Sequence, residues 1–252
     1  MKKIALITGA TSGIGEACAL LFAQNNYNLI ITGRRQDRLA ELKNKLEKNF
    51  PIEILPLCFD VRNEAEVRAN LGGLSGNWKS IDVLINNAGL AAGRANIDEG
   101  LLEDWEQMID TNVKGLLYVS KEIIPLMKNR KSGHIINLGS IAGKETYQGG
   151  NVYCATKHAV DALTKSMRID LLPYHIRVTG IHPGAVETEF SLVRFKGDAQ
   201  KAKAVYDGFT PLSAHDVADA IYYAASRPAH VTINELTIMP TAQANTTHLL
   251  KN

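Results

Sequence analysis

Short runs of apolar residues alternate along the whole chain with longer stretches of helical period. The runs are rich in Ile, Val and Leu and almost continuously apolar, which is typical of strands covered on both faces. This alternation predicts an α/β fold in which a doubly wound, seven-stranded parallel sheet is flanked by helices. The seven expected strands are residues 4–8, 28–32, 54–60, 83–86, 134–138, 177–182 and 235–239.

Three of the intervening stretches carry clear helix signals. Residues 37–48 place leucines at i, i+3 and i+7 on one face and charged residues on the other. Residues 101–128 predict one long helix that Pro125 kinks or ends, because proline lacks the N–H that a helix interior needs. Ser213 and Asp216 form a capping-box pattern that opens a further helix, which we expect to run to about Ser226.

Residues 187–210 differ in composition and hydrophobic pattern from the rest of the chain. They are more polar, contain no expected strand, and lie between the sixth expected strand and the capped helix. A segment in this position predicts a mobile lid over a binding cleft, and an ordinary surface insertion is the alternative. Since no internal repeat or linker-like tract interrupts the sequence, we expect a single domain over residues 1–252.

Charge and cysteine content narrow the class of partner. The chain has 28 basic and 26 acidic residues, a formal net charge of +2, without a basic or acidic block. We therefore expect a small-molecule partner rather than nucleic acid or a membrane, and no run of the sequence approaches the ~18 apolar residues of a membrane span. Cys18, Cys58 and Cys154 are odd in number and form no CxxC pair, which indicates a reducing compartment and hence the cytoplasm.

The first expected strand leads directly into the glycine-rich sequence TGATSGIG and then into a helical pattern over residues 16–24. Glycines let a backbone turn tightly and approach a pyrophosphate, whose charge is stabilised by the free N–H groups and the dipole of the following helix. A strand, a glycine turn and a helix in this order predict a Rossmann-like dinucleotide site. The expected cofactor contacts in the turn are Gly9, Thr11, Ser12, Gly13, Ile14 and Gly15.

The residues that follow the second expected strand indicate which dinucleotide binds. Sites for NAD place an acidic residue there, about 20 residues after the glycine turn, to hold the ribose 2′-hydroxyl. This chain has Arg34 and Arg35 instead. Two guanidinium groups can pair with a 2′-phosphate in fork geometry, so we expect NADP. The alternative is that both arginines only solvate the start of the next helix.

Further short motifs occur in a fixed order at or near the ends of the later strands. They are Asp60-Val61, Asn86-Asn87-Ala88-Gly89, Asn112, Ser140, Tyr153 with Lys157, and Pro183-Gly184. Together with the glycine turn, this ordered set closely resembles the short-chain dehydrogenase/reductase family over essentially the whole chain. The resemblance implies an NADP-dependent oxidoreductase that acts on a CH–OH group. It also implies a homotetramer built through the long helix and the helix that carries Tyr153.

The resemblance assigns roles around the nucleotide. Asp60 is expected to hydrogen-bond the adenine amino group, with Val61 beside it. Asn87, Ala88 and Gly89 are expected to line the adenosine ribose and support the central strand, and a purely structural role for Asn87 is the alternative. The nicotinamide amide is expected to meet the main chain after the sixth strand, at Pro183, Gly184, Val186 and Thr188.

Tyr153 and Lys157 suit acid–base chemistry at an alcohol or carbonyl group. They are four residues apart in the helical pattern of residues 151–172, so both side chains project from one face. A free phenol has a pKa of about 10, and a neighbouring ammonium and an oxidised nicotinamide would both lower that pKa. Ser140 is expected to hold the substrate oxygen against Tyr153, and Lys157 to hold the nicotinamide ribose. By the resemblance, Asn112 supports a water-linked proton path from Lys157.

The sequence predicts no metal site. The seven histidines show no ligand spacing such as HxxxH, and the cysteines are scattered. We expect His158 and His182 to be packing or surface residues.

Within the family, four segments resemble the NADP-dependent 3-hydroxy acid dehydrogenases, which act on serine and related 3-hydroxy acids or on malonic semialdehyde. They are residues 103–116, 149–157, 187–198 and 228–240, and they include the sequences FSLVRFKGD and PAHVTINELTIMP. Such a substrate needs a cation for its carboxylate. Arg194 and Lys196 of the expected lid are the candidates, and we favour Arg194 as a substrate-binding residue; the alternative is that both are solvated charges.

Two other functions stay open at this point. One is a broader NADPH-dependent carbonyl reductase of neutral ketones. The other, which the intact set of catalytic residues disfavours, is a non-catalytic NADP-binding protein.

Overall fold

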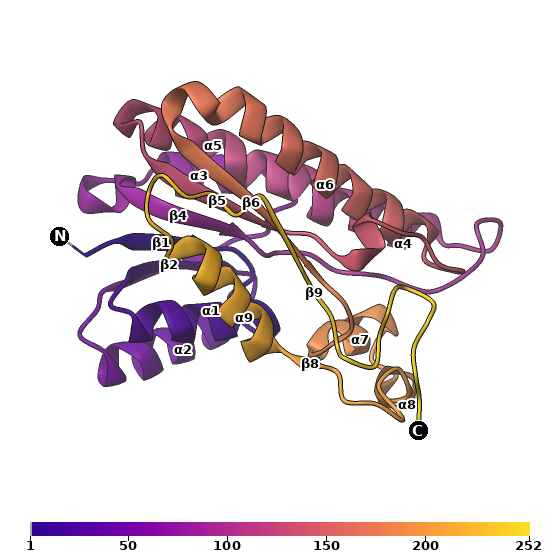
Figure 1. The fold of residues 1–252 in the computed structure, drawn as a ribbon. Helices are drawn as coiled ribbons and strands as arrows, with labels where there is room; N and C mark the ends of the chain where they lie inside the picture. Colours follow the sequence, from indigo (N-terminus) through magenta and orange to yellow (C-terminus); the bar gives the residue numbers. More distant parts are fainter. Residues whose placement is uncertain (1) are drawn as a thin grey trace.

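The computed structural model describes residues 2–252 as a parallel sheet between two layers of helices (Figure 1). The strands of the main sheet are β1 (Ile4–Ile7), β2 (Asn28–Gly33), β3 (Ile54–Cys58), β4 (Ile81–Asn86), β5 (Gly133–Leu138), β6 (Ile176–Pro183) and β9 (Glu235–Ile238). The α-helices are α1 (Gly13–Gln24), α2 (Gln36–Asn49), α3 (Glu64–Gly72), α4 (Leu102–Ile109), α5 (Leu116–Arg130), α6 (Asn151–Leu171), α7 (Glu189–Arg194), α8 (Ala199–Ala204) and α9 (Ala214–Ala225). Single 3-10 or π-helical turns are η1 (Gly76–Lys79), η2 (Asp110–Gly115), η3 (Ile141–Gly143) and η4 (Leu172–Tyr174).

The main sheet has the strand order β3-β2-β1-β4-β5-β6-β9, and every neighbouring pair is parallel. All seven expected strands are present, so the predicted doubly wound α/β fold is confirmed. The order changes direction between β1 and β4, and the carboxyl ends of these strands open a crevice of the kind that binds nucleotides. β3 ends at Cys58, so Asp60 lies two residues beyond the strand instead of within it.

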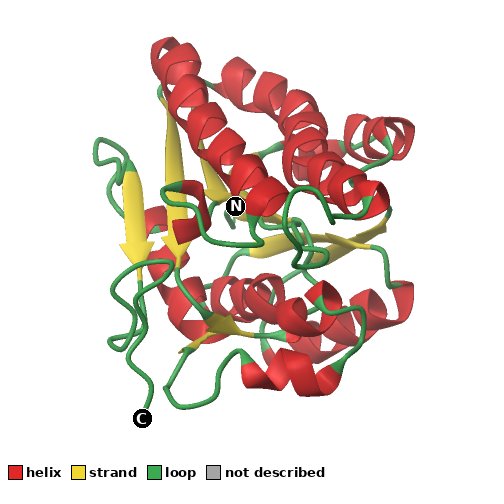
Figure 2. Cartoon of the chain, turned by 90° about the vertical axis from the view of Figure 1, so that its right-hand side faces the viewer, coloured by secondary structure: helices red, strands yellow, loops and turns green. Residues whose placement is uncertain are grey.

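Helices α1, α2 and α9 cover one face of the sheet, and α3, α5 and α6 cover the other (Figures 1 and 2). Each interface is a separate apolar core. In the first core the three leucines of α2 are buried, as their spacing predicts, and Phe22 packs edge-on against Tyr222 with ring centroids 5.3 Å apart. In the second core Ile123, Met127 and Val160 are buried against the strands. Removal of this apolar surface from water stabilises the packing of the helices on the sheet. The packed sheet in turn holds the strand ends that carry the site.

The long helix expected over residues 101–128 is interrupted, but not where the sequence suggested. α4 and α5 are joined without a break by the π-helical turn η2, which contains Asn112. Of the two effects predicted for Pro125, a kink or an end of the helix, the end was wrong, because α5 continues to Arg130. Because proline has no N–H, the carbonyl group of Lys121, four residues before Pro125, loses its helical hydrogen bond. Pro125 and Lys121 are both exposed, so water can hydrate this carbonyl group.

The segment from residue 187 to 210 contains α7 and α8, and a second small sheet flanks it. β7 (Val186–Glu187) pairs in parallel with β8 (Leu212–Ser213). The expectation of no strand here was wrong at its first residue, since a two-residue strand is too short to show a period of two. The capping box at Ser213 and Asp216 is confirmed, with the Ser213 side chain accepting from the Asp216 N–H. Within residues 2–252, no helix is both long and apolar enough to cross a membrane.

Candidate active site

A cleft of about 970 Å³ opens at the carboxyl ends of the parallel strands. Its walls are the glycine turn, the ends of β2, β4, β5 and β6, the start of α6, and helix α7. The sequence-predicted residues that line it are Gly9, Thr11, Ser12, Gly13, Ile14, Arg34, Arg35, Asp60, Val61, Asn87, Ala88, Gly89, Ser140, Tyr153, Lys157, Pro183, Gly184, Val186, Thr188 and Arg194. Gly15 and Asn112 lie behind this lining. A cleft of this volume and composition suits a dinucleotide with a small substrate.

The glycine turn presents a helix N-terminus to the cleft. Gly9 and Gly13 have φ angles of +68° and +54°, a left-handed conformation that favours glycine. Among the described residues, the side chain of the N-cap Ser12 makes no hydrogen bond to the first turn of α1, which leaves the N–H groups of that turn to an anion. A Cβ atom on Gly15 would lie 2.6 Å from Nδ2 of Asn87. Gly15 therefore permits close packing and does not contact the cleft.

Asn87 ties the glycine turn to β4. Its Nδ2 donates to the carbonyl oxygens of Thr8 at 2.8 Å and Gly9 at 3.2 Å. The backbone N–H groups of Asn87 and Ala88 both donate to Oγ1 of Thr8, at 3.0 and 2.9 Å. The structural role that the sequence left open for Asn87 is thus present. Its contact with the adenosine ribose stays a prediction.

Arg34 and Arg35 are held differently at the end of β2. The Arg34 side chain is 57% exposed, and its nearest ion-pair partner is Asp60 at 3.8 Å. Arg35 donates to Thr11 Oγ1 at 2.9 Å, to Ser12 Oγ at 2.9 Å and to Glu189 Oε2 at 3.0 Å. Arg34 is therefore the more available of the two cations, while Arg35 joins the glycine turn to the first residue of α7.

The Asp60 carboxylate is already engaged. Arg62 donates to both of its oxygens, with the shortest contact at 2.7 Å. Burial on its own raises the pKa of Asp60, but the hydrogen bonds and charge of Arg62 outweigh it and lower that pKa below the ordinary value. Asp60 is thus a charged acceptor at the cleft wall, and its contact with adenine stays a prediction.

Tyr153, Ser140 and Lys157 meet at the floor of the cleft and are each less than one-tenth exposed. Ser140 is the N-cap of η3 at the end of β5, and its Oγ accepts from the Ala142 N–H at 3.1 Å. Lys157, one turn after Tyr153 on α6, donates from Nζ to the carbonyl oxygen of Leu138 at 2.8 Å. A strand end and a long helix therefore bring the three predicted side chains together.

The pKa values of this group differ from the sequence-based expectation. Burial raises the pKa of Tyr153 well above its ordinary value, and the nearby phenol of Tyr147 raises it further. The Ser140 hydroxyl and the charge of Arg194 lower it only in part. Burial also lowers the pKa of Lys157 to about 8. The Lys157 ammonium donates to Leu138, and the lowering of the phenol pKa that the sequence led us to expect from this ammonium together with an oxidised nicotinamide stays a prediction.

Asn112 braces the loop after β4 from behind. Its Oδ1 accepts from the Leu90 N–H at 2.8 Å, and its Nδ2 donates to the Leu90 carbonyl at 2.8 Å and to Thr156 Oγ1 at 3.0 Å. A Cβ atom on Gly89 would lie 3.2 Å from this Oδ1 and 3.6 Å from Nζ of Lys157. Asn112 thus positions the backbone beside the lysine. The proton path expected for it stays a prediction.

Arg194, the last residue of α7, faces Tyr153. Its guanidinium lies 5.8 Å from the centre of the Tyr153 ring and 5.5 Å from that of Tyr147. It forms no ion pair with any residue from 2 to 252, and its Nε donates only to the carbonyl oxygen of Gly93, at 3.3 Å. The other candidate, Lys196, pairs with Asp104 at 2.9 Å. Of these two cations, Arg194 is the one directed at the cleft.

Four residues that the sequence reasoning missed also shape the cleft. Tyr147 and Phe190 flank Tyr153, and the Phe190 ring lies 5.7 Å from it. Arg94 lies 5.8 Å from the Tyr147 ring. Gln243, near the C-terminus, accepts from the Ala185 N–H at 2.8 Å and so fixes the loop that begins at Gly184, directly after β6. Phe190 belongs to the FSLVRFKGD sequence, which could have signalled it; the other three depend on tertiary contacts.

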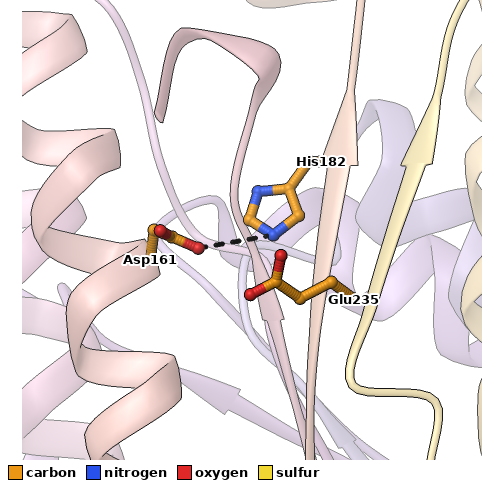
Figure 3. A group of neighbouring side chains, drawn as sticks. All are labelled: Asp161, His182 and Glu235. Atoms are coloured by element: carbon orange, nitrogen blue, oxygen red, sulfur yellow. Dashed lines mark ion pairs between the residues drawn. The ribbon is translucent and has the colours of Figure 1, made fainter. Parts of the chain in front are cut away.

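One group of metal-ligand side chains occurs among the described residues, behind Ser140. It consists of Asp161 from α6, His182 from β6 and Glu235 from β9 (Figure 3). Lys144 lies 2.6 Å from Asp161 and 2.8 Å from Glu235, and Lys165 lies 2.8 Å from Asp161. The carboxylates are therefore already neutralised by ammonium groups, which a metal ion would have to displace. Because Lys144 directly follows η3, we interpret the group as an ion-pair cluster that anchors the Ser140 turn to the sheet.

His182 is buried within this cluster, as a packing residue would be. Burial, and then the charge of Lys144, lowers the pKa of His182 to about 4. The imidazole is therefore neutral at pH 7.

Residues 3–198 match the protein family described as short chain dehydrogenase. The chain belongs to this family. Its sheet order and its ordered motifs are therefore those of an oxidoreductase that acts on CH–OH groups, as the sequence predicted.

Similar proteins span almost the whole chain. It is 48% identical over 242 residues to the NADP-dependent 3-hydroxy acid dehydrogenase YdfG of Escherichia coli (strain K12), covering 96% of each chain. It is 44% identical over 245 residues to sulfoacetaldehyde reductase 2 of Chromohalobacter salexigens, covering 97% of this chain and 96% of that one. The solved structure of the closed form of serine dehydrogenase complexed with NADP⁺ matches this short-chain dehydrogenase with a TM-score of 0.92 at 46% identity, over 99% of both chains.

Proposed function

We propose that this short-chain dehydrogenase interconverts a small 3-hydroxy acid, such as serine or 3-hydroxypropanoate, and the corresponding semialdehyde or keto acid. The chain is an NADP-dependent oxidoreductase, like the NADP-dependent 3-hydroxy acid dehydrogenase and the NADP⁺-bound serine dehydrogenase just described. The observation that carries the substrate assignment is the Arg194 guanidinium, 5.8 Å from the Tyr153 ring and free of ion pairs within residues 2–252. A cation in this place favours a substrate whose carboxylate lies close to its reacting oxygen.

The chemistry divides between the cofactor and three side chains. Bound NADP supplies or accepts the hydride at the carbinol carbon. Ser140 holds the substrate oxygen, and Tyr153 takes the hydroxyl proton in oxidation or returns one in reduction. Because burial raises the pKa of Tyr153, the phenol keeps its proton until positive charge stabilises the phenolate. Within the described chain, Arg194 supplies part of that charge, and Lys157 supplies more if its ammonium leaves Leu138 for the site.

The nucleotide contacts extend this proposal along the cleft. The pyrophosphate meets the N-terminus of α1 at the glycine turn, and the 2′-phosphate meets Arg34 and Arg35. Asp60 and Val61 border the adenine, and Asn87 to Gly89 border its ribose. The main chain of Pro183, Gly184, Val186 and Thr188 receives the nicotinamide amide. Residues 187–210, which contain α7 and α8, act as the lid.

The substrate assignment is tested by comparing hydroxy acids with neutral alcohols of similar size. We expect 3-hydroxypropanoate and serine to give higher kcat/KM than 1,3-propanediol or the methyl ester of 3-hydroxypropanoate. In Arg194→Ala, KM for the acids should rise about 10- to 100-fold, the range for a charged hydrogen-bonded contact, while KM for the neutral alcohols stays unchanged. Lys203→Ala removes a positive charge from α8 outside the cleft lining and is the matched control.

The same assay decides between this proposal and a carbonyl reductase of neutral ketones. Phe190, Val193 and Leu90 give the cleft an apolar part that a neutral ketone could occupy. If neutral substrates exceed the acids in kcat/KM and Arg194→Ala leaves KM for the acids unchanged, the 3-hydroxy acid assignment fails.

We also propose a reducing, cytoplasmic setting. All three cysteines are free thiols, and Cys58 is exposed, which supports this setting.

We further propose a homotetramer. Ile169 at the end of α6 and Leu172 just beyond it are 74% and 73% exposed, and Leu117 on α5 is 38% exposed, so both helices expected at the interface present apolar side chains. Sedimentation of the parent and of Ile169→Asp tests the assembly, because a buried aspartate would shift the species to a smaller one.

A further inference from the structure

Glu189 is the first residue of the lid helix α7, yet its side chain is directed to the nucleotide end of the cleft. Its carboxylate accepts from Nη1 of Arg35 at 3.0 Å and from Nη1 of Arg38 at 2.7 Å. The hydrogen bond from Arg38 is the main cause that lowers the pKa of Glu189 below its ordinary value. An anion of the protein itself is therefore bound between two guanidinium groups at neutral pH.

One of these two groups, Arg35, belongs to the pair at which the 2′-phosphate of NADP is proposed to bind, while Arg38 lies in the first turn of α2 outside the cleft lining. Arg35 also donates to Thr11 and Ser12 of the glycine turn, so only part of its hydrogen-bonding capacity is left for a ligand. Arg34, Arg35 and Arg38 together carry three positive charges, and Glu189 cancels one of them. A phosphate with nearly two negative charges arriving beside Arg35 is attracted by the arginines and repelled by Glu189.

The base of the lid also rests on the glycine turn. A Cβ atom on Gly13 would lie 3.3 Å from the Cβ of Thr188, the residue before Glu189. Thr188 caps α7, with its Oγ1 accepting from the Phe190 N–H at 3.2 Å. The position of Glu189 is thus fixed by its own helix and by the turn beneath it, and the carboxylate stays close to Arg35.

We propose that Glu189 is an internal counter-anion of the 2′-phosphate site, which weakens the binding of NADP relative to NAD and ties the lid to the glycine turn. The proposal rests on the assignment of the 2′-phosphate to Arg34 and Arg35. Glu189 and the phosphate share Arg35, so binding of one loosens the hold on the other, and this coupling is reciprocal. A bound nucleotide is thereby held less tightly than three arginines alone would hold it, which favours its release after turnover.

The test is the affinity of Glu189→Gln for nucleotides in the absence of substrate. Glutamine keeps the size of the side chain but removes the charge and one of the two acceptor oxygens. We expect the Kd for NADP⁺ to fall about 3- to 10-fold at low ionic strength, since two partly exposed ion pairs no longer compete with the phosphate. The Kd for NAD⁺ should stay unchanged, and the gain for NADP⁺ should shrink in about 0.5 M KCl.

The matched control is Glu187→Gln, which removes one negative charge from the exposed residue of strand β7, two residues before Glu189. It should leave both dissociation constants unchanged. If Glu189→Gln binds NADP⁺ no more tightly than the parent does, or more weakly, the counter-anion role is overturned. The assignment of the phosphate is tested separately by Arg34→Ala, which should weaken NADP⁺ but not NAD⁺; an unchanged Kd for NADP⁺ there would refute that assignment itself.

Discussion

The two walls of the cleft are built in opposite ways. The proposed catalytic residues Ser140, Tyr153 and Lys157 are buried and are carried by the end of β5 and by α6, a helix of 21 residues. The proposed lid opposite them contains α7 and α8, which have six residues each. Leu192 and Val193 of α7 are 40% and 47% exposed. The catalytic wall is part of the core, whereas the proposed lid is held by a few polar contacts and by the packing of Phe190 against Tyr153.

This difference separates two demands on the enzyme. Proton and hydride transfer need side chains fixed to within a fraction of an ångström, which a packed core supplies. Binding and release of substrate need a segment that can open at low cost, which short helices with exposed apolar side chains supply. The catalytic wall meets its demand at an energetic cost, because it buries ionisable groups. Predictions for the two walls therefore differ in kind, and those for the catalytic wall are larger.

The largest expected effect is on turnover, from Tyr153→Phe. This change removes the hydroxyl that exchanges the proton and keeps the ring that packs against Phe190. We expect kcat to fall about 1,000-fold or more, in the upper range for loss of a general acid–base group, with the Kd for NADP⁺ unchanged. Stopped-flow absorbance at the nicotinamide band and a nucleotide titration measure the two quantities. Parental turnover in the folded variant would contradict the mechanism.

Acid should weaken the catalytic side of the molecule next, through two buried histidines. Burial, and then Lys144, lowers the pKa of His182 to about 4; burial, and then Arg177, lowers that of His134 to about 3. As the pH falls below about 6.5, the unfolded chain takes up protons that the folded chain refuses, so the free energy of unfolding falls. Between pH 7 and pH 5 we expect a loss of about 2 kcal/mol for each histidine.

Urea unfolding at pH 7, 6 and 5 measures this loss. His182→Gln should reduce the slope of stability against pH, whereas His230→Gln, which alters an exposed side chain, should leave it unchanged. Equal slopes in all three proteins would show that His182 does not titrate as its burial requires.

The sequence predicts those features of the architecture that depend on local composition, and it misses those that depend on tertiary contacts. The parallel strands are apolar on both faces, so their composition reveals them, and the chemical residues occupy the strand ends that a parallel sheet brings together. The end of the long helix could not be predicted at Pro125, because only the fold shows that this residue faces water. The two-residue strands β7 and β8 form through pairing with each other and carry no periodic pattern.

In the candidate site, too, local motifs were predictable and tertiary contacts were not. The positions of Ser140, Tyr153 and Lys157 could be predicted from ordered motifs. The direction of the Tyr153 pKa could not, since it depends on how many apolar atoms surround the phenol. The pairing of Glu189 with Arg35, 154 positions away, needs the tertiary structure as well.

Lys157 has a proposed catalytic role, and its burial is expected to lower the free energy of unfolding. Burial lowers its pKa to about 8, below the ordinary value, so the folded chain holds the ammonium less readily than the unfolded chain does. The cost is fully present below pH 8 and is relieved as the pH rises from about 8 towards the unfolded pKa of about 10.4.

Lys157→Met should therefore raise the free energy of unfolding at pH 7 by about 1–2 kcal/mol, after allowance for the lost hydrogen bond to Leu138, while it removes activity. Urea unfolding at pH 7 and pH 9.5 measures it, and the gain should be smaller at the higher pH. Lys165→Met removes an exposed ammonium from the same helix together with its ion pair to Asp161, so it should not stabilise. Destabilisation by Lys157→Met at both pH values would show that the lysine supports the catalytic wall.

The smallest effect is expected on the lid, from Lys196→Met. This change removes the ion pair of 2.9 Å with Asp104, one of the few contacts between the lid and the loop and helix after β4. Lys196 has a φ angle of +52°, which unbranched methionine tolerates about as well as lysine does. Because the lysine is 55% exposed, we expect KM for the substrate to rise only about 2- to 5-fold, with kcat and the Kd for NADP⁺ unchanged. Lys203→Met, on the neighbouring lid helix, controls for charge. A fall in kcat comparable to that of Tyr153→Phe would mean that the lid fixes the catalytic geometry, and the contrast between the two walls would no longer hold.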